Sequence, residues 1–362
     1  MSNQSASVSG EILIEVKNLK KYFPVKRGIF IEKHMGNVKA VDDISFSVKK
    51  GETIGLVGES GCGKTTTGRV ITRLEQATAG EVRFEGQDIL GLEGEELRQL
   101  RRELQIVFQD PYSSLNPRMT AGNIISFPLA THRLYPGPQR DKRVGDLLEL
   151  VGLTKGQAKW YPHEFAAGER QRIVLATALA TNPKFIFCDE PVSALDVSAQ
   201  AQVLNLLRDI KTRLDITIMV VAHNLCVVEY LSGRVVVMYL GKIVEMAETD
   251  DLYQRPLHPY TQALISAVPT VEVGRTGSEI VLQGEIPSPM NPPRGCRFNT
   301  RCQSKIGEVC ENIEPKLIDV GNRHYTACHL VGTPSHAETR AADRAPEQAH
   351  AADAITKRGE SR

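Results

Sequence analysis

The sequence predicts an α/β fold built around a mainly parallel sheet, and three observations support this prediction. Short apolar runs of strand length alternate with longer segments of helical periodicity, as in βαβ units. A glycine-rich loop stands directly after one of these apolar runs. The composition is that of a globular chain, because 41% of the residues are hydrophobic and 24% are charged, which disfavours a disordered or membrane-spanning class.

The first half of the chain predicts a strand-rich unit that receives a helical insert. Ile12 to Val16 and Val41 to Val48 alternate apolar and polar side chains, as half-buried strands do. Thr53 to Val57 has the composition of a buried strand. Helical periodicity then covers Asp141 to Leu153 and Arg170 to Ala180, and we expect the insert there.

The second half predicts parallel strands that a hairpin closes. Phe185 to Cys188 and Thr217 to Val221 are short apolar runs, and Ala199 to Leu214 between them has a helical pattern. Val235 to Tyr239 and Ile243 to Glu245 are separated by a short glycine-containing turn, which is typical of a hairpin. We expect the main unit, residues 1–265, to end there.

Charge and hydropathy narrow the class of partner. Lys and Arg number 44 against 43 Asp and Glu, so the net charge of +1 gives no field that favours nucleic acid, and we expect no nucleic-acid partner. No uninterrupted apolar stretch has the roughly 18 residues that a spanning helix needs. The polar start from Met1 to Gly10 does not resemble a secretory signal. A role at a membrane would therefore require docking through other proteins.

The loop after Thr53 to Val57 predicts a phosphate-binding site. The pattern G-x-x-x-x-G-K-[ST] is matched by Gly58, Glu59, Ser60, Gly61, Cys62, Gly63, Lys64 and Thr65, and Thr66 follows in the expected helix. Backbone N–H groups of such a loop and the positive end of the helix converge on phosphate oxygens. We expect Lys64 to reach the terminal phosphates and the hydroxyl of Thr65 to ligate Mg²⁺.

Two carboxylates follow the apolar run Phe185 to Cys188. Asp189 and Glu190 would lie at the C-terminal edge of a parallel strand, where ligands of such sheets bind. Asp189 is suited to hold Mg²⁺ through water, and Glu190 is suited to accept the proton of an attacking water. The alternative is a solvated strand end, which the upstream phosphate-binding loop disfavours.

Further motifs follow in order, and residues 12–265 resemble the ATP-binding-cassette ATPases. The matching residues are Phe23, Gln109, the loop Ser193, Ala194, Leu195 and Asp196, and His223. The resemblance implies a P-loop NTPase (RecA-like) core with an antiparallel β subdomain and a helical insert at about residues 111–180. It also implies that Gln109 senses Mg²⁺, that the loop ending at Asp196 communicates between two nucleotide sites, and that His223 contacts the γ-phosphate. Phe23 takes the place of the adenine-stacking aromatic, with a core aromatic as the alternative.

The family signature L-S-G-G-Q is altered in this chain. After Phe165 the aligned residues are Ala166, Ala167, Gly168 and Glu169. In the family a Ser hydroxyl at this element contacts the γ-phosphate bound to the partner cassette, whereas Ala166 has no hydroxyl. A hydrogen bond to a charged group contributes roughly 1.5–3 kcal/mol. We therefore expect an unequal pair, in which a partner with an intact signature completes this chain's own site, while a homodimer would have two impaired sites.

Several segments are similar to the ATPases of dipeptide, oligopeptide and nickel importers. They are Gln109 to Met119, Val192 to Ser198 and His258 to Thr261, while Lys20 to Val25 and Val57 to Gly63 resemble the F-type partner of a pair. The resemblance implies a second ATPase subunit, two transmembrane permeases and, indirectly, an extracytoplasmic substrate-binding protein. It places the chain peripherally at the cytoplasmic face of the cell membrane. Oligosaccharide and nickel stay open as alternative cargoes.

Four of the seven cysteines lie in residues 266–330, where Pro and Gly are frequent and periodicity is weak. They are Cys296, Cys302, Cys310 and Cys328, and they predict a small cysteine-containing C-terminal module before a disordered tail at 331–362. Disulfides are disfavoured in a reducing compartment, whereas four thiolates suit a [4Fe–4S] cluster or structural Zn²⁺. The resemblance to peptide-importer ATPases implies the cluster, and four free buried cysteines are a further alternative.

These patterns together predict an enzyme that couples hydrolysis of ATP, with Mg²⁺, to import of di- or oligopeptides. Glu190 and His223 favour hydrolysis, whereas the altered signature favours a subunit that binds nucleotide with weak or no hydrolysis of its own. A soluble cassette acting on nucleic acid or ribosomes is disfavoured by the near-neutral charge and the single cassette.

Overall fold

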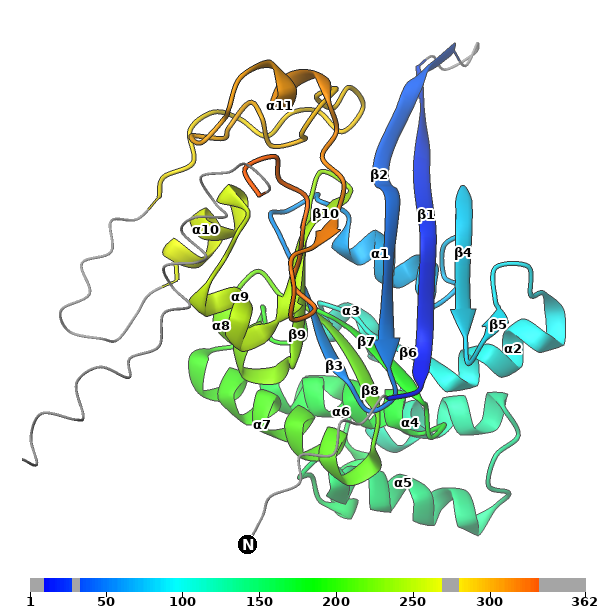
Figure 1. Ribbon diagram of the computed structural model, residues 1–362. Helices are drawn as coiled ribbons and strands as arrows, with labels where there is room; N and C mark the ends of the chain where they lie inside the picture. The colour runs from blue at the N-terminus through cyan, green and yellow to red at the C-terminus, as the bar shows by residue number, and fades with distance from the viewer. Residues whose placement is uncertain (1–9, 28–32, 269–279, 332–362) are drawn as a thin grey trace, which may run out of the picture.

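The strands of the computed structural model, which describes residues 10–27, 33–268 and 280–331, form two sheets (Figure 1). The first sheet is antiparallel, in the order β2 (Lys33–Lys49), β1 (Ile12–Arg27), β4 (Ala79–Phe84) and β5 (Gln87–Asp88). The second has the order β11 (Ile318–Asp319), β12 (Tyr325–Thr326), β10 (Lys242–Glu248), β9 (Arg234–Tyr239), β3 (Thr53–Val57), β8 (Thr217–Val221), β7 (Phe185–Asp189) and β6 (Leu104–Val107). The predicted tail, apart from Val331, lies outside the described residues.

Five neighbouring strands in the second sheet, from β9 to β6, run parallel, which confirms the predicted sheet. All residues of β3, β7 and β8 are buried, because elements pack on both faces of a parallel sheet. The predicted strands Thr53–Val57 and Thr217–Val221 match residue for residue. β9 and β10 form the predicted hairpin, although β10 continues to Glu248.

β1 and β2 are longer than the alternating pattern predicts. The pattern covers Ile12 to Val16 and Val41 to Val48, whereas pairing runs from Ile12 opposite Lys49 to Arg27 opposite Lys33. Several register shifts interrupt the ladder between these ends. A shift moves side chains to the other face, so alternation along the sequence stops while backbone pairing continues.

Helices between β6 and β7 form the predicted helical insert. They are α3 (Pro111–Ser114), α4 (Ala121–Thr131), α5 (Pro138–Leu150), the 3₁₀ helices η1 (Lys155–Lys159) and η2 (Pro162–Glu164), and α6 (Ala167–Leu179). The remaining helices are α1 (Lys64–Ile71), α2 (Gly94–Glu103), α7 (Val197–Leu214), α8 (Leu225–Leu231), α9 (Thr249–Gln254), α10 (Pro259–Ser266) and α11 (Glu308–Asn312). In the part of the chain that the structure describes, no helix combines the length and apolar character needed to cross a membrane.

Helix α1 lies between the two sheets and contacts β2, β7 and β8 (Figure 1). Its approach to β7 depends on Gly68, because a Cβ at this position would lie 2.0 Å from the ring of Phe187. Any larger residue would have to push α1 away from the sheet. Gly68 therefore fixes the depth of the helix whose first residue is Lys64.

The C-terminal segment, residues 280–331, joins the main sheet through β12, which pairs with β10 (Figure 1). Cys296 and Phe298 are part of the same apolar core as the helical insert. The ring of Phe298 packs against Tyr239 and Tyr260, with centroids 5.2 and 5.3 Å apart. The C-terminal segment therefore shares part of the core of the ATP-binding unit, and the predicted cysteine-containing module stays a prediction.

A buried histidine ties this segment to β10 and α9. The ring of His324 is fully buried, with Nε2 2.6 Å from Glu245 Oε1 and Nδ1 2.7 Å from Asp251 Oδ2. Burial alone would lower the pKa of His324, but hydrogen bonds and charge from Glu245 and Asp251 outweigh it and raise the pKa. The native protein therefore favours the imidazolium form.

This pair of contacts predicts a stability that falls as the pH rises. In the unfolded chain the pKa of a histidine is about 6.5. The stabilisation of the fold by protonated His324 is therefore complete below that pH, and it is lost as the pH rises through the higher pKa that His324 has in the folded protein. Urea unfolding between pH 6 and 9 should show this loss, and His324→Gln should flatten the curve. His329→Gln is the matched control, since the His329 ring is hydrogen-bonded to the backbone oxygen of Ile313 and not to a carboxylate among the described residues. An unchanged slope in His324→Gln would contradict the assignment.

Candidate nucleotide-binding and hydrolysis site

The residues predicted to bind and hydrolyse nucleotide meet at one edge of the parallel strands. Nine of them line a pocket of about 270 Å³ together with Ala40. The lining residues are Ala40, Ser60, Gly61, Gly63, Lys64, Thr65, Thr66, Gln109, Glu190 and His223. The carboxyl ends of parallel strands lie at the same edge, and each of these loops follows β3, β6, β7 or β8.

The phosphate-binding loop closes around the ammonium group of Lys64. Its Nζ donates to the backbone oxygens of Gly58 at 2.6 Å and Glu59 at 3.0 Å, and the residue is 5% exposed. Gly63 has a φ of 108° and lies so close to Ala40 that a Cβ would be 2.1 Å from the Ala40 oxygen. Only glycine fits there, and α1 begins at the next residue. The loop thus brings a buried cation to the N-terminus of a helix, an arrangement that attracts phosphate.

Thr65 and Asp189 lie side by side, as the predicted Mg²⁺ ligands should. The Thr65 hydroxyl donates to Asp189 Oδ1 at 2.8 Å. Burial raises the pKa of Asp189, while the hydrogen bond from Thr65 and the positive charges of Arg69 and Lys64 oppose the increase. A hydroxyl and a carboxylate are oxygen donors of the kind that Mg²⁺ prefers, and a cation there would stabilise the ionised carboxylate.

Glu190 is held from both sides by the two other residues predicted to act in hydrolysis. Gln109 Nε2 donates to Glu190 Oε2 at 2.7 Å, and His223 Nε2 lies 2.5 Å from Glu190 Oε1. Glu190 is 7% exposed and has a φ of 50°, in the left-handed region that costs a non-glycine residue energy. The carboxylate is therefore fixed at the pocket, where it can orient a water molecule and accept its proton.

The altered signature forms the start of α6 and does not line this pocket. Ala166 and Ala167 are exposed, and Ala166 occupies the N-cap position. The backbone N–H of Ala166 donates to the Glu169 carboxylate at 3.0 Å, so Glu169 caps its own helix. Gly168 stands in the first turn between them.

The loop Ser193, Ala194, Leu195 and Asp196 connects Glu190 to α7. The Ser193 hydroxyl donates to the Glu190 backbone oxygen at 3.1 Å. Asp196 caps α7 by accepting from the backbone N–H of Ala199 at 2.9 Å. The loop is thus hydrogen-bonded to the backbone of Glu190, and its role in communication between nucleotide sites stays a prediction.

Four predicted nucleotide-binding residues, Phe23, Gly58, Glu59 and Cys62, do not line the pocket, and neither does the predicted Mg²⁺ ligand Asp189. Phe23 is half-buried in β1, and Lys21 Nζ lies 4.6 Å from the centre of its ring. Cys62 is buried, and burial raises its pKa even though Lys64 Nζ lies 3.7 Å from the sulfur. Glu59 contributes its backbone oxygen to Lys64 but turns its carboxylate to Arg301. Adenine stacking by Phe23 stays a prediction.

The four C-terminal cysteines do not form a recognisable metal site. All four are free, and within residues 10–27, 33–268 and 280–331 no three His, Cys, Asp or Glu side chains are placed to hold a metal ion together. Burial, with a contribution from the neighbouring thiols, raises the pKa of Cys296 to about 12 and of Cys328 to about 11. The described residues therefore give no support to the predicted [4Fe–4S] cluster or to Zn²⁺.

The sequence pattern did not predict the contacts that residues outside the phosphate-binding loop make with Glu59. Arg301 pairs with Glu59 at 2.6 Å, and the Glu59 backbone N–H donates to the Tyr260 hydroxyl at 2.7 Å. Tyr22, next to Phe23, donates its hydroxyl to Asp42. Tyr260 belongs to a segment that resembles the peptide-importer ATPases, but nothing in its spacing pointed to the loop, about 200 residues away.

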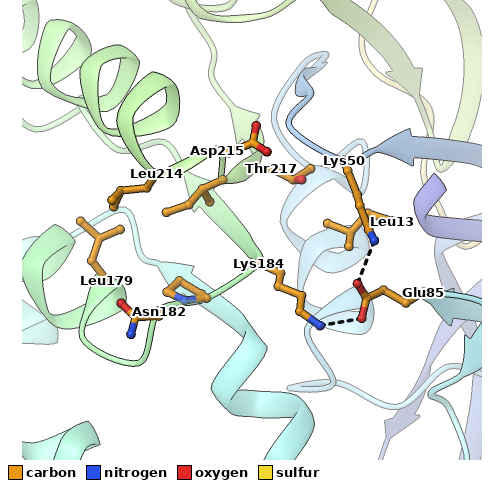
Figure 2. Close-up of a pocket in the computed structure, with 11 residues that line it drawn as sticks. Leu13, Lys50, Glu85, Leu179, Asn182, Lys184, Leu214, Asp215 and Thr217 are labelled. Carbon is orange, nitrogen blue, oxygen red and sulfur yellow. Dashed lines mark hydrogen bonds and ion pairs between the residues drawn. The ribbon is translucent and has the colours of Figure 1, made fainter. Parts of the chain in front are cut away.

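A larger pocket, of about 400 Å³, lies at the opposite edge of the sheet, where β7 and β8 begin (Figure 2). Lys50 and Lys184 both point at Glu85, with Nζ to carboxylate distances of 3.2 and 2.6 Å. This carboxylate neutralises part of their charge, and none of the predicted catalytic residues lines the pocket. The smaller pocket therefore remains the predicted nucleotide site.

Comparison with known proteins identifies the family of this chain. Residues 41–193 match the ABC transporter family, and residues 244–310 match the oligopeptide/dipeptide transporter C-terminal region. The oligopeptide transport ATP-binding protein AppF of Bacillus subtilis (strain 168) is 50% identical over 323 residues, which cover 88% of this chain and 98% of that protein. A probable peptide ABC transporter ATP-binding protein, y4tS of Sinorhizobium fredii, is 47% identical over 320 residues, 88% of this chain and 90% of that one.

Solved structures show the same fold. The ATP-binding cassette MJ0796, in a dimeric post-hydrolysis state bound to ADP and Pi, is 28% identical, with a TM-score of 0.57. The match covers 66% of this chain and 99% of that one. The chain contains the phosphate-binding loop and the paired Glu190 and His223, and its relatives match it along nearly their whole length. It therefore belongs to the family of ATP-binding subunits of oligopeptide ABC transporters.

Proposed function

We propose that this chain hydrolyses ATP to energise the import of di- or oligopeptides. One observation carries the proposal: the Glu190 carboxylate is held between Gln109 and His223 in the pocket that Lys64 and Thr65 also line. A subunit that only bound nucleotide would not need a carboxylate held in place by two neighbouring side chains, as that of Glu190 is. The chain would act peripherally at the cytoplasmic face of the membrane, with two permeases and a second cassette, and indirectly with a substrate-binding protein.

Each residue of the pocket has a part in the proposed reaction. Lys64 and the backbone N–H groups of the loop bind the β- and γ-phosphates, which places the γ-phosphorus opposite Glu190. Thr65 and Asp189 would hold Mg²⁺, which supplies positive charge to the phosphate oxygens when bound. Glu190 orients the attacking water and accepts its proton, and His223 donates a hydrogen bond to the γ-phosphate.

The names of the relatives support the peptide cargo. AppF and y4tS are described as oligopeptide and peptide transport proteins, and the chain covers 98% and 90% of their lengths. Nickel and oligosaccharide are the alternatives, because the cassette does not contact cargo. We divide the chain into an ATP-binding cassette at 1–265, a C-terminal segment at 266–330 and a tail at 331–362. The proposed cofactor is Mg²⁺, and ATP is the proposed substrate.

Uptake by the reconstituted transporter tests both parts of the proposal. The full chain, its second cassette and the permeases would be placed in vesicles with the binding protein, and uptake of a labelled oligopeptide would be followed with and without ATP. We expect ATP-dependent uptake that Lys64→Ala abolishes. Uptake of nickel or an oligosaccharide alone would contradict the cargo, and uptake without ATP hydrolysis would contradict the mechanism.

The start of α6 supports an unequal pair of cassettes. Ala166 presents no hydroxyl to a γ-phosphate on a partner, and the neighbouring Glu169 adds negative charge. The chain's own pocket is equipped with Lys64, Glu190 and His223. We therefore propose that the start of α6 in this chain contributes less to the partner's nucleotide site than the partner's own signature contributes to the site of this chain.

Substitution of Ala166 tests the unequal pair. Ala166→Ser restores the donor to the γ-phosphate, and we expect the ATPase rate of the chain alone to rise about tenfold, the low end for a hydrogen bond to a charged group. Ala166→Gly is the matched control, because glycine caps a helix nearly as well as serine but has no hydroxyl. Steady-state phosphate release measures both. Vigorous hydrolysis by the wild-type chain alone, equal to that with its partner, would contradict the pair.

A further inference from the structure

We propose that Arg301, in the C-terminal segment, is a positioning residue of the phosphate-binding loop. Its guanidinium neutralises the carboxylate of Glu59 and holds it behind the loop, so that nucleotide affinity depends on a residue far outside the ATP-binding core. The inference rests on the proposed binding of ATP at this loop and deepens it. It assigns the C-terminal segment a part in setting the affinity of the site.

The ion pair between Arg301 and Glu59 is two-pronged and largely buried. Arg301 Nη1 lies 2.6 Å from Glu59 Oε2, and Nη2 lies 3.0 Å from Oε1. The Arg301 side chain is 7% exposed, and Nη1 is also 3.4 Å from the Tyr239 hydroxyl. Parallel hydrogen bonds of this kind fix orientation as well as charge. The carboxylate of Glu59 is therefore committed to Arg301.

The backbone of Glu59 is held as firmly as its side chain. Its N–H donates to the Tyr260 hydroxyl at 2.7 Å, and its carbonyl oxygen accepts from Lys64 Nζ at 3.0 Å. Tyr260 in turn packs on Tyr239, with ring centroids 4.7 Å apart. Glu59 is thus fixed at three points, and two of the partners, Arg301 and Tyr260, come from the chain after the core hairpin.

The charge of Glu59 gives this arrangement a functional consequence. An unpaired carboxylate in a loop that binds phosphate would repel the ligand, and the repulsion is strong near a partly buried site. Among the described residues, Arg301 is the cation that pairs with this carboxylate. Loss of Arg301 would leave an unpaired carboxylate on Glu59, whose backbone oxygen contacts Lys64, and this negative charge would oppose the binding of phosphate.

A second contact shows how the segment is anchored. Arg297 pairs with Asp42 and donates to the Leu240 backbone oxygen at 3.3 Å. Between the two arginines the chain turns tightly, with the Arg301 N–H donating to the Phe298 oxygen at 3.0 Å. Arg297 and Arg301 thus extend from one short turn, the first to β2 and the second to the phosphate-binding loop.

Arg301→Met in the full-length chain tests the inference, with Mg·ATP binding measured by isothermal titration calorimetry. We expect the Kd to rise about tenfold, within the range of coupling between sites. Adding Glu59→Gln should restore the wild-type Kd, because no charge is then left unpaired. The deficit of Arg301→Met should also shrink at high salt, which screens the repulsion.

Arg323→Met is the matched control, because Arg323 belongs to the same segment and pairs with Glu248 at 3.0 Å on an exposed surface. Equal affinity of Arg301→Met and Arg323→Met, or no rescue by Glu59→Gln, would overturn the inference. If Arg301→Met does not fold, Arg301→Gln and Arg301→Lys decide: the neutral variant should raise the Kd and the charged variant should keep it near the wild-type value, and equal Kd values for the two would overturn the inference. Failure of the wild-type chain to bind Mg·ATP would instead contradict the proposed function.

Discussion

Replacing Glu190 by glutamine should lower the rate of ATP hydrolysis by at least about two orders of magnitude, the usual contribution of a positioned general base. The amide is nearly isosteric with the carboxylate but cannot accept the proton of the attacking water. Gln109 and His223 would still contact the side chain, so the pocket should keep its shape. Phosphate release from the full chain with its partner cassette measures the loss.

Nucleotide affinity separates this chemical defect from misfolding. We expect Glu190→Gln to bind Mg·ATP at least as well as the wild type, because Lys64 and Thr65 are untouched and a negative charge is removed from the pocket. Glu311→Gln is the control, since Glu311 forms an exposed pair with Lys305 far from the loop in sequence. Hydrolysis at the wild-type rate by Glu190→Gln would refute the assigned base.

Replacing Arg297 by methionine should reduce the free energy of unfolding by about 3–5 kcal/mol, the cost of breaking a buried ion pair by removing one partner. The side chains of Arg297 and Asp42 are only 7% and 9% exposed. Burial would raise the pKa of Asp42, but hydrogen bonds from Tyr22 and Arg297 and the charge of Lys242 hold it below its usual range. Without Arg297 much of that compensation is lost.

Urea unfolding monitored by circular dichroism measures the effect. Asp42→Asn in the Arg297→Met background should recover part of the stability, because the uncompensated charge is then gone. Arg323→Met, which breaks an exposed pair, should change the free energy of unfolding by no more than about 1 kcal/mol. A loss for Arg297→Met as small as that of the control would show that the segment is not anchored at Asp42.

The parallel strands and the catalytic edge were predictable because each depends on short-range patterns. β3 and β8 are buried on both faces, so their apolar runs define the strands completely. Polar residues directly after such strands, including Glu190 and His223, must meet at one edge of the sheet. The proximity of Glu190 and His223 could therefore be predicted from the strand order alone, without knowing the direction of either side chain.

The contacts of the C-terminal segment could not be predicted for the opposite reason. Arg301 and Glu59 are 242 residues apart, and His324 and Glu245 are 79 apart, with no periodicity to connect them. The cysteine prediction was unsupported for a related reason. Four thiols in a segment with few apolar residues suggested a metal centre, whereas Cys296 packs into the core that the segment shares with the helical insert.

The start of α6 sets a condition on how two copies of this chain could close around ATP. A helix N-terminus has few free N–H donors, and they attract one anion well. Here the carboxylate of Glu169, from within the same helix, already takes the N–H of Ala166. A γ-phosphate arriving on another copy would meet a helix start where this donor is occupied and a carboxylate lies in the first turn, so closure between identical chains would bring two negative groups together.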